Sequence, residues 1–105
     1  MTGSRLETFK ALVEKEPGNP LGRYSLANEY YKLGMYEESI KEINEYLKIA
    51  DDQGAVYRTL AECYMQTGNP EMAREAYYKG IEAANRHGHP GMAEEYEEAI
   101  DLLGD

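Results

Sequence analysis

Two histidines and a proline mark one turn in which a metal site could form. His87 and His89 flank a glycine and are followed by Pro90, which is typical of a turn between helices. Their imidazole nitrogens could supply two metal ligands, but no cysteine or histidine motif beside them completes a tetrahedral site. Neither histidine belongs to a nucleophile and base arrangement. We therefore expect an ordinary exposed turn here, with no metal and no catalytic triad.

The cysteine and the paired carboxylates are explained by structure better than by catalysis. Cys63 lies between Leu60 and Tyr64 on an apolar helical stripe, with no cationic neighbour to stabilise a thiolate. Adjacent carboxylates such as Glu37 and Glu38 point about 100° apart on a helix, so they cannot form the facing pair of a glycosidase. The glycines are scattered and form no phosphate-binding loop. We predict that the protein is not an enzyme and uses no cofactor.

Composition narrows the class of protein and the partners that it can bind. The chain has 105 residues, 11 basic and 20 acidic, and a net charge of −9, which opposes binding to phosphate backbones or anionic lipid. One cysteine allows no intrachain disulfide, and no apolar run reaches the length of a membrane span. We expect a single domain over residues 1–105 in the cytoplasm, with no nucleic-acid or membrane partner.

An internal repeat of 34 residues organises the chain. Within each copy the apolar residues recur at the spacing of a helix and not at that of a strand. Each copy contains two such stripes, which predicts a pair of helices. The offset aligns Leu26 with Leu60, Ala27 with Ala61, Tyr30 with Tyr64, Gly34 with Gly68, Glu37 with Glu71, Leu47 with Ile81, and Ala50 with Ala84.

Glycines and prolines predict where the helices of each pair end and begin. Gly34 and Gly68 follow the first stripe of each copy, where a left-handed residue can close a helix. Asn19 and Asn69 each precede a proline, so the asparagine side chain is expected to cap the helix that the proline begins.

Further signals define the remaining helices. Ser4 and Glu7 are spaced as a capping box, which predicts a first helix over residues 5–15 with Leu6, Phe9, Leu12 and Val13 as its apolar residues. Asp51 and Asp52 are expected to cap the helix that holds Leu60. Pro90 begins a last helix that is rich in acidic residues and suited to capping the array. The sequence therefore predicts an all-α protein of about six helices.

These residues resemble the tetratricopeptide repeat. The resemblance rests on Leu-Ala-x-x-Tyr-x-x-x-Gly in both copies, followed by Tyr36 in the first and Pro70 in the second. It implies antiparallel helix hairpins stacked as a right-handed α-solenoid. Complete repeats would span 20–53 and 54–87, with half-repeat helices at 5–16 and 90–103. The large aromatic near the start of a repeat is Tyr57 in the second copy but Arg23 in the first, a departure that predicts weaker helix pairing there.

The resemblance also implies where a partner binds. In this family the first helices of successive repeats line a concave groove that receives a peptide or a partner helix. Tyr24 and Tyr31 lie off the inward stripe of their helix and are seven residues apart, so they should share another face. The matching positions predict a partner-binding groove lined by Tyr24, Asn28, Tyr31 and Lys32 of the first repeat and by Arg58, Glu62, Met65 and Gln66 of the second.

Charge indicates which ligand such a groove accepts. Some family members hold a terminal carboxylate with cations, but this chain has Tyr24 and Glu95 at positions of that clamp. Acidic residues near the groove, such as Glu62 and Glu98, favour a basic or apolar peptide instead. The leading interpretation is a non-catalytic adaptor that binds another protein. The alternative is a structural module that forms a homo-oligomer through the same surface or through its open helical ends.

Overall fold

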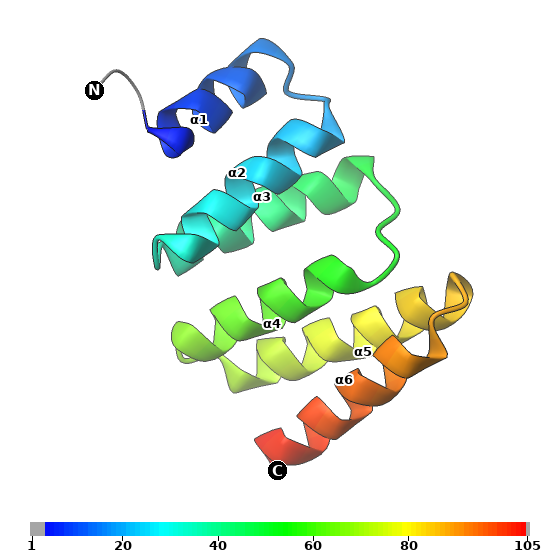
Figure 1. Ribbon diagram of the computed structural model, residues 1–105. Coiled ribbons are helices and arrows are strands. Elements are labelled where there is room, and N and C mark those ends of the chain that lie inside the picture. The colour runs from blue at the N-terminus through cyan, green and yellow to red at the C-terminus, as the bar shows by residue number, and fades with distance from the viewer. Residues whose placement is uncertain (1–3, 105) are drawn as a thin grey trace. The chain divides into compact units, whose positions relative to one another are not determined.

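The structure, a computed structural model, describes residues 4–104, so residues 1–3 and 105 of the predicted domain lie outside the described part. The described residues form helices and no strand, which confirms the predicted all-α class (Figure 1). The last helix covers residues 90–103, the bounds expected for the second half-repeat helix. The first helix covers residues 5–15 and ends one residue before the end expected for the first half-repeat helix, residue 16. The helices are α1 (Arg5–Lys15), α2 (Pro20–Lys32), α3 (Tyr36–Ile49), α4 (Ala55–Gln66), α5 (Pro70–Arg86) and α6 (Pro90–Leu103).

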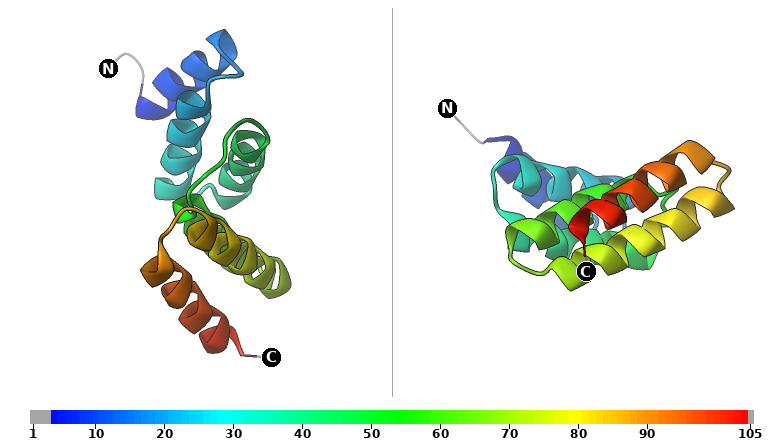
Figure 2. Two further views of the ribbon diagram at one scale, coloured as in Figure 1. Left: turned by 90° about the vertical axis from the view of Figure 1, so that its right-hand side faces the viewer. Right: turned by 90° about the horizontal axis from the view of Figure 1, so that it is seen from below.

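Two compact units divide the chain between Asp51 and Asp52. In the first unit α1 packs on α2, and α2 pairs with α3. In the second unit α4 pairs with α5, and α5 packs on α6. Figure 2 shows that the paired helices of each unit run antiparallel. A single domain over residues 1–105 and the repeat boundaries within it stay predictions.

Side-chain caps form at Ser4 and Asn19 but not at Asn69. The Ser4 Oγ accepts a hydrogen bond from the Glu7 backbone N–H at 3.2 Å, and the Asn19 Oδ1 accepts one from the Leu21 N–H at 3.0 Å. The capping prediction for Asn69 is wrong, because its amide donates backwards to the carbonyl oxygen and the hydroxyl of Thr67. Helix α5 still begins at Pro70, where the proline lacks the N–H that a cap would satisfy.

Glycines and an aspartate shape the connections as predicted. Gly34 and Gly68 have φ angles of +76° and +79°, the left-handed conformation that closes α2 and α4. The Asp52 carboxylate accepts hydrogen bonds from the Gly54 and Val56 N–H groups, at 2.8 and 3.0 Å. It therefore caps α4, although Gly54 itself occupies the N-cap position.

The first unit has a small core. Its buried apolar side chains are Val13, Leu26, Ala27 and Ile43. The buried Ser39 hydroxyl ties α3 to α2 by donating to the Ala27 carbonyl oxygen at 2.9 Å. Of the apolar residues predicted for the first helix, only Val13 is buried, and Leu12 is 45% exposed. Helix α1 thus covers α2 with one face and leaves another face open within this unit.

The second unit is packed around small residues of α5. An added Cβ at Gly80 would lie 2.6 Å from a Tyr96 ring carbon and 2.9 Å from the Tyr57 Cβ, so the absence of a side chain lets α6 and α4 approach α5 closely. Tyr96 is 1% exposed, and its hydroxyl donates to the Gly54 carbonyl oxygen at 2.6 Å. Within residues 4–104, no helix combines the length and the apolar character that crossing a membrane requires.

Candidate binding surfaces on α2 and α4

The four predicted groove residues of the first repeat lie on α2. Tyr24, Asn28 and Tyr31 are half-buried, and Lys32 is exposed. The Tyr24 ring packs on Tyr46 of α3 with centroids 5.3 Å apart. Tyr31 packs edge-on against a second tyrosine of α3 at 6.0 Å. Both rings therefore hold the α2–α3 hairpin together while keeping part of their surface accessible.

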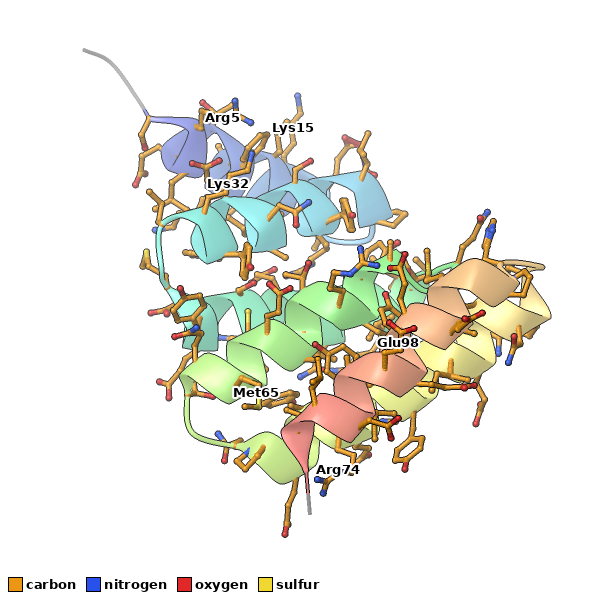
Figure 3. All side chains as sticks on the ribbon, turned by 60° about the horizontal axis from the view of Figure 1, so that its bottom comes forward. Arg5, Lys15, Lys32, Met65, Arg74 and Glu98 are labelled. Atoms are coloured by element: carbon orange, nitrogen blue, oxygen red, sulfur yellow. The ribbon has the colours of Figure 1, made fainter. Side chains whose placement is uncertain are left out.

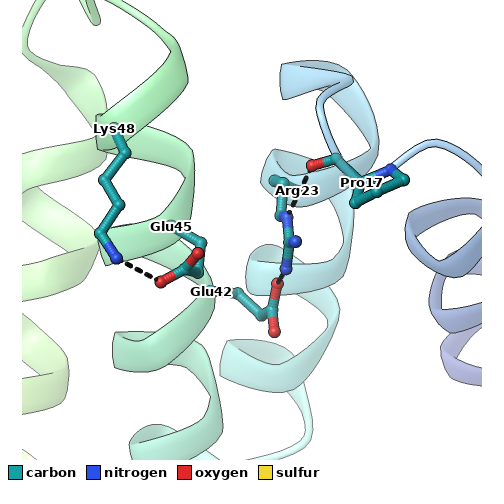
Figure 4. Close-up of polar contacts among 5 residues, drawn as sticks. All are labelled: Pro17, Arg23, Glu42, Glu45 and Lys48. Carbon is teal, nitrogen blue, oxygen red and sulfur yellow. Dashed lines mark hydrogen bonds and ion pairs between the residues drawn. The ribbon is translucent and has the colours of Figure 1, made fainter.

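Arg23 orients this hairpin from the position where the second repeat has an aromatic residue. Its guanidinium forms an ion pair with Glu42 of α3 at 2.8 Å and donates from Nε to the Pro17 carbonyl oxygen at 3.2 Å (Figure 4). The two charged side chains are 17% and 12% exposed. The ion pair is therefore partly shielded from water, and a hydrogen-bonded ion pair is stronger there than on an open surface.

The other four predicted groove residues lie on α4 of the second unit. Arg58, Met65 and Gln66 are exposed, and Glu62 is half-buried. Met65 is 42% exposed, and Figure 3 shows it on α4 alongside α6, which carries the exposed Glu98. Exposed methionine and arginine side chains are typical of protein interfaces because they adapt to a partner and bury large areas.

Arg58 makes two contacts with α6 that sequence reasoning did not predict. Its guanidinium lies 2.7 Å from the Glu95 carboxylate, and its central carbon lies 5.4 Å from the centre of the Tyr96 ring. The side chains of Arg58 and Glu95 are 45% and 65% exposed, so both remain accessible to a ligand. The acidic character of position 95 was evident in the sequence, but its pairing depends on how α6 lies against α4.

The tyrosine beneath this ion pair is structural. Burial raises the pKa of Tyr96 to about 12, against the opposing influence of Arg58. Burial also raises the pKa of Tyr77, whose ring centre lies 5.5 Å from that of Tyr96. Both phenols therefore stay neutral at physiological pH, which suits hydrogen-bonded packing and not proton transfer.

The residues first considered for chemistry occupy structural positions. Cys63 is fully buried, as its place on an apolar stripe indicates. His87 and His89 are half-buried, so the expectation of an exposed turn is wrong for these side chains. The His89 ring lies 2.7 Å from the side-chain oxygen of Gln53, which holds this turn against the start of the unit. Among residues 4–104 no three histidine, cysteine or acidic side chains gather as a metal site would require.

Comparison with known proteins identifies the class to which this fold belongs. The sequence pattern of the tetratricopeptide repeat matches residues 22–53 and 55–87, and the chain belongs to this family. Tetratricopeptide repeats generally mediate protein–protein interaction, and the proteins that carry them are generally non-catalytic scaffolds that bind proteins or peptides.

One curated relative is similar over most of the chain. It is the small glutamine-rich tetratricopeptide repeat-containing protein 2 of Mycosarcoma maydis, 26% identical over 80 residues. The match covers 76% of this chain and 23% of that protein. The chain thus corresponds to about a quarter of that relative's length, within a protein named for the same repeat.

Proposed function

We propose that this chain is a non-catalytic adaptor that binds a peptide or helix of a partner protein through exposed residues of α2 and α4. The observation that carries the proposal is the row of accessible side chains on α4. Arg58 and Met65 lie two helical turns apart on it and remain exposed while the apolar stripe of the same helix is buried. Tyr24 and Tyr31 give α2 a comparable row, already held in place by the rings of α3.

Charge supports a basic or apolar partner segment. In the second unit Glu62, Glu98 and Asp101 add negative charge to the helices α4 and α6. Arg58 lies among them with its own charge balanced by Glu95. Such a surface repels acidic segments and nucleic acid, and attracts lysine or arginine side chains. The lone buried cysteine suits a reducing, cytoplasmic setting for this interaction.

Affinity isolation from the source cell tests the adaptor proposal. The full chain should retain a partner that Tyr31→Ala and Arg58→Ala variants lose, with about tenfold weaker binding expected for a contact near the centre of an interface. Tyr78→Ala is the matched control, because Tyr78 is 55% exposed on α5, a helix that carries none of the predicted binding residues. Circular dichroism establishes that each variant remains helical. Equal retention by all variants would overturn the assignment of these residues.

Self-association is a second candidate, favoured by apolar exposure in the first unit. Leu12 and Leu21 are 45% and 70% exposed beside a cavity of about 350 Å³ that Phe9 also lines, between α1 and α2. Exposed apolar side chains that gather in one place often mark a contact between proteins. Sedimentation at several protein concentrations distinguishes the candidates, because a homo-oligomer gains mass without any partner. A constant monomer mass would exclude self-association in that concentration range.

A further inference from the structure

The ion pair between α4 and α6 places a carboxylate where an acidic ligand would bind. Arg58 is the exposed cation that α4 offers at its predicted binding row, and Glu95 already contacts it at 2.7 Å. The Tyr96 ring beneath holds the guanidinium from a second side. The site is therefore engaged from within the protein before any ligand arrives.

The same two helices offer an apolar contact two turns further along. Met65 and Leu102 each lie seven residues beyond Arg58 and Glu95, which places them about 10 Å on and near the same helical face. These side chains are 42% and 88% exposed. Because α4 and α6 run in the same direction in Figures 1 and 3, Met65 and Leu102 both lie beyond the ion pair, toward the C-terminal ends of their helices.

Carboxylates separate the ion pair from the apolar pair. Glu62 lies one turn beyond Arg58 on α4, and Glu98 lies one turn beyond Glu95 on α6. Figure 3 shows Glu98 and Met65 on these neighbouring helices. We name the surface formed by Arg58, Glu62, Met65, Glu95, Glu98 and Leu102 the α4–α6 surface. It combines exposed apolar side chains with three glutamates and one arginine.

We propose that Glu95 determines specificity on the α4–α6 surface by occupying Arg58 in place of an acidic ligand group. The proposal rests on the proposed adaptor function and names the chemistry of its partner: a segment with lysine or arginine beside leucine-like residues. A ligand carboxylate must displace Glu95 to reach Arg58. Since Glu95 is attached to the same protein, it competes at the high effective concentration of an intramolecular group. A basic ligand instead meets the exposed carboxylate of Glu98 on α6, which attracts it.

Two matched probe peptides test this proposal on the full chain. Both are acetylated and amidated glycine-serine peptides with two leucines; one carries two lysines and the other two glutamates at the same positions. Calorimetric titration of the wild type should show tighter binding of the lysine probe. Glu95→Gln should strengthen binding of the glutamate probe by about three- to tenfold, a range that fits the modest strength of an exposed ion pair.

Two further variants separate local pairing from net charge. Glu97→Gln removes the same charge from α6, but residue 97 is two positions on and faces another direction, so it should change binding of either probe by less than about twofold. In Glu95→Gln, a second change of Arg58→Gln should abolish the gain for the glutamate probe. Circular dichroism of each variant checks that these changes leave the helices intact.

The outcomes distinguish this proposal from the adaptor function beneath it. If the wild type binds the lysine probe and Glu95→Gln does not improve binding of the glutamate probe, the role of Glu95 is overturned while the adaptor function stands. Equal effects of Glu95→Gln and Glu97→Gln overturn it as well, because general charge then explains the preference. If neither probe binds the wild type or Glu95→Gln, the α4–α6 surface is not the peptide site, and both proposals fail there.

Discussion

The two units of the chain differ in how they combine charge and packing. In the first unit the Arg23–Glu42 ion pair between α2 and α3 is largely buried, at 17% and 12% exposed, and Arg5 pairs with Glu29 between α1 and α2, whereas the Arg58–Glu95 pair of the second unit is 45% and 65% exposed. In the second unit the alanines of α5 are buried, and the Tyr96 ring and the Tyr57 Cβ lie against Gly80 of the same helix. Among the described residues, four buried apolar side chains belong to the first unit and eleven to the second.

This difference shows that one repeat pattern tolerates two packing solutions. Both units have the same helix hairpin, because the turn glycines and the Leu-Ala-Tyr stripe recur in each. The units differ in the residue at one position near the start of the repeat, where the family usually has a large aromatic side chain. Tyr57 packs against α5 in the second unit, whereas Arg23 replaces that contact with charge in the first. Directional polar contacts therefore compensate for a smaller apolar core.

The largest expected effect comes from filling the space at Gly80. Gly80→Ala should destabilise the protein by about 2–3 kcal/mol, because the new methyl group would overlap the Tyr96 ring and the Tyr57 Cβ. Gly22→Ala on α2 is the control, since its Cβ would meet Val13 at an ordinary 3.7 Å and alanine favours a helix by about 1 kcal/mol. Urea unfolding measures both. Equal effects would contradict the contrast between the units.

Removing the Tyr96 hydroxyl should have the next largest effect. Tyr96→Phe leaves the buried Gly54 carbonyl oxygen without this donor, which should cost about 1–2 kcal/mol in urea unfolding. The pH dependence has a defined sign. Because the pKa is raised from 10.0 to about 12 in the folded protein, the stabilisation is fully present below pH 10 and is lost as the pH rises toward 12.

Alkaline unfolding of Tyr96→Phe tests whether the stability contributed by Tyr96 is lost as the pH rises. The variant should lose less stability than the wild type between pH 10 and 12, because it lacks the phenol with the raised pKa. Absorbance near the tyrosinate band follows ionisation in the same samples. Parallel stability curves for the two proteins would rule out this phenol as a source of alkaline instability.

Breaking the Arg23 ion pair should cost somewhat less. Arg23→Ala leaves the Glu42 carboxylate, only 12% exposed, without its cation, and should destabilise the protein by about 1 kcal/mol. Thermal unfolding at low salt measures the loss. A variant as stable as the wild type would show that the first unit does not depend on charge, and the comparison between the units would then rest on packing alone.

The smallest effect is expected at the exposed pair on α3. Lys48 donates to the Glu45 carboxylate at 2.8 Å, and this hydrogen bond, followed by the charge of Lys48, lowers the pKa of Glu45 (Figure 4). Lys48→Ala should raise that pKa toward 4.5 without a resolvable change in the urea midpoint. NMR titration of the Glu45 side chain measures the shift. An unchanged pKa would show that the pair does not persist in solution.

Local sequence signals were enough to predict the helices. Gly34 and Gly68 predicted the two turns because they adopt a conformation that other residues avoid, and Pro90 predicted the start of α6 because proline fits the first turn of a helix. The Asn69 cap failed for a local reason too. The Asn69 amide nitrogen donates to the neighbouring Thr67, and the asparagine side chain makes no cap hydrogen bond; the asparagine-proline pattern does not reveal this alternative partner.

The candidate site was less accessible to sequence reasoning, because its contacts join residues far apart in the chain. Periodicity placed Tyr24 off the inward stripe, but it could not show the ring of Tyr46 beside it. Arg58 was identified as a surface residue, yet its pairing with Glu95 depends on the position of α6 within the second unit. Side-chain pairs of this kind follow from tertiary packing and not from spacing along one helix.

The burial of Cys63 gives this protein a built-in reporter of local opening. Its thiol has no solvent-accessible surface and lies on α4 in the second unit, and it is the single cysteine of the chain. A thiol-specific dye can react only when the helices around it separate. The labelling rate therefore reports local opening around this residue of α4, while circular dichroism reports the helices of both units together.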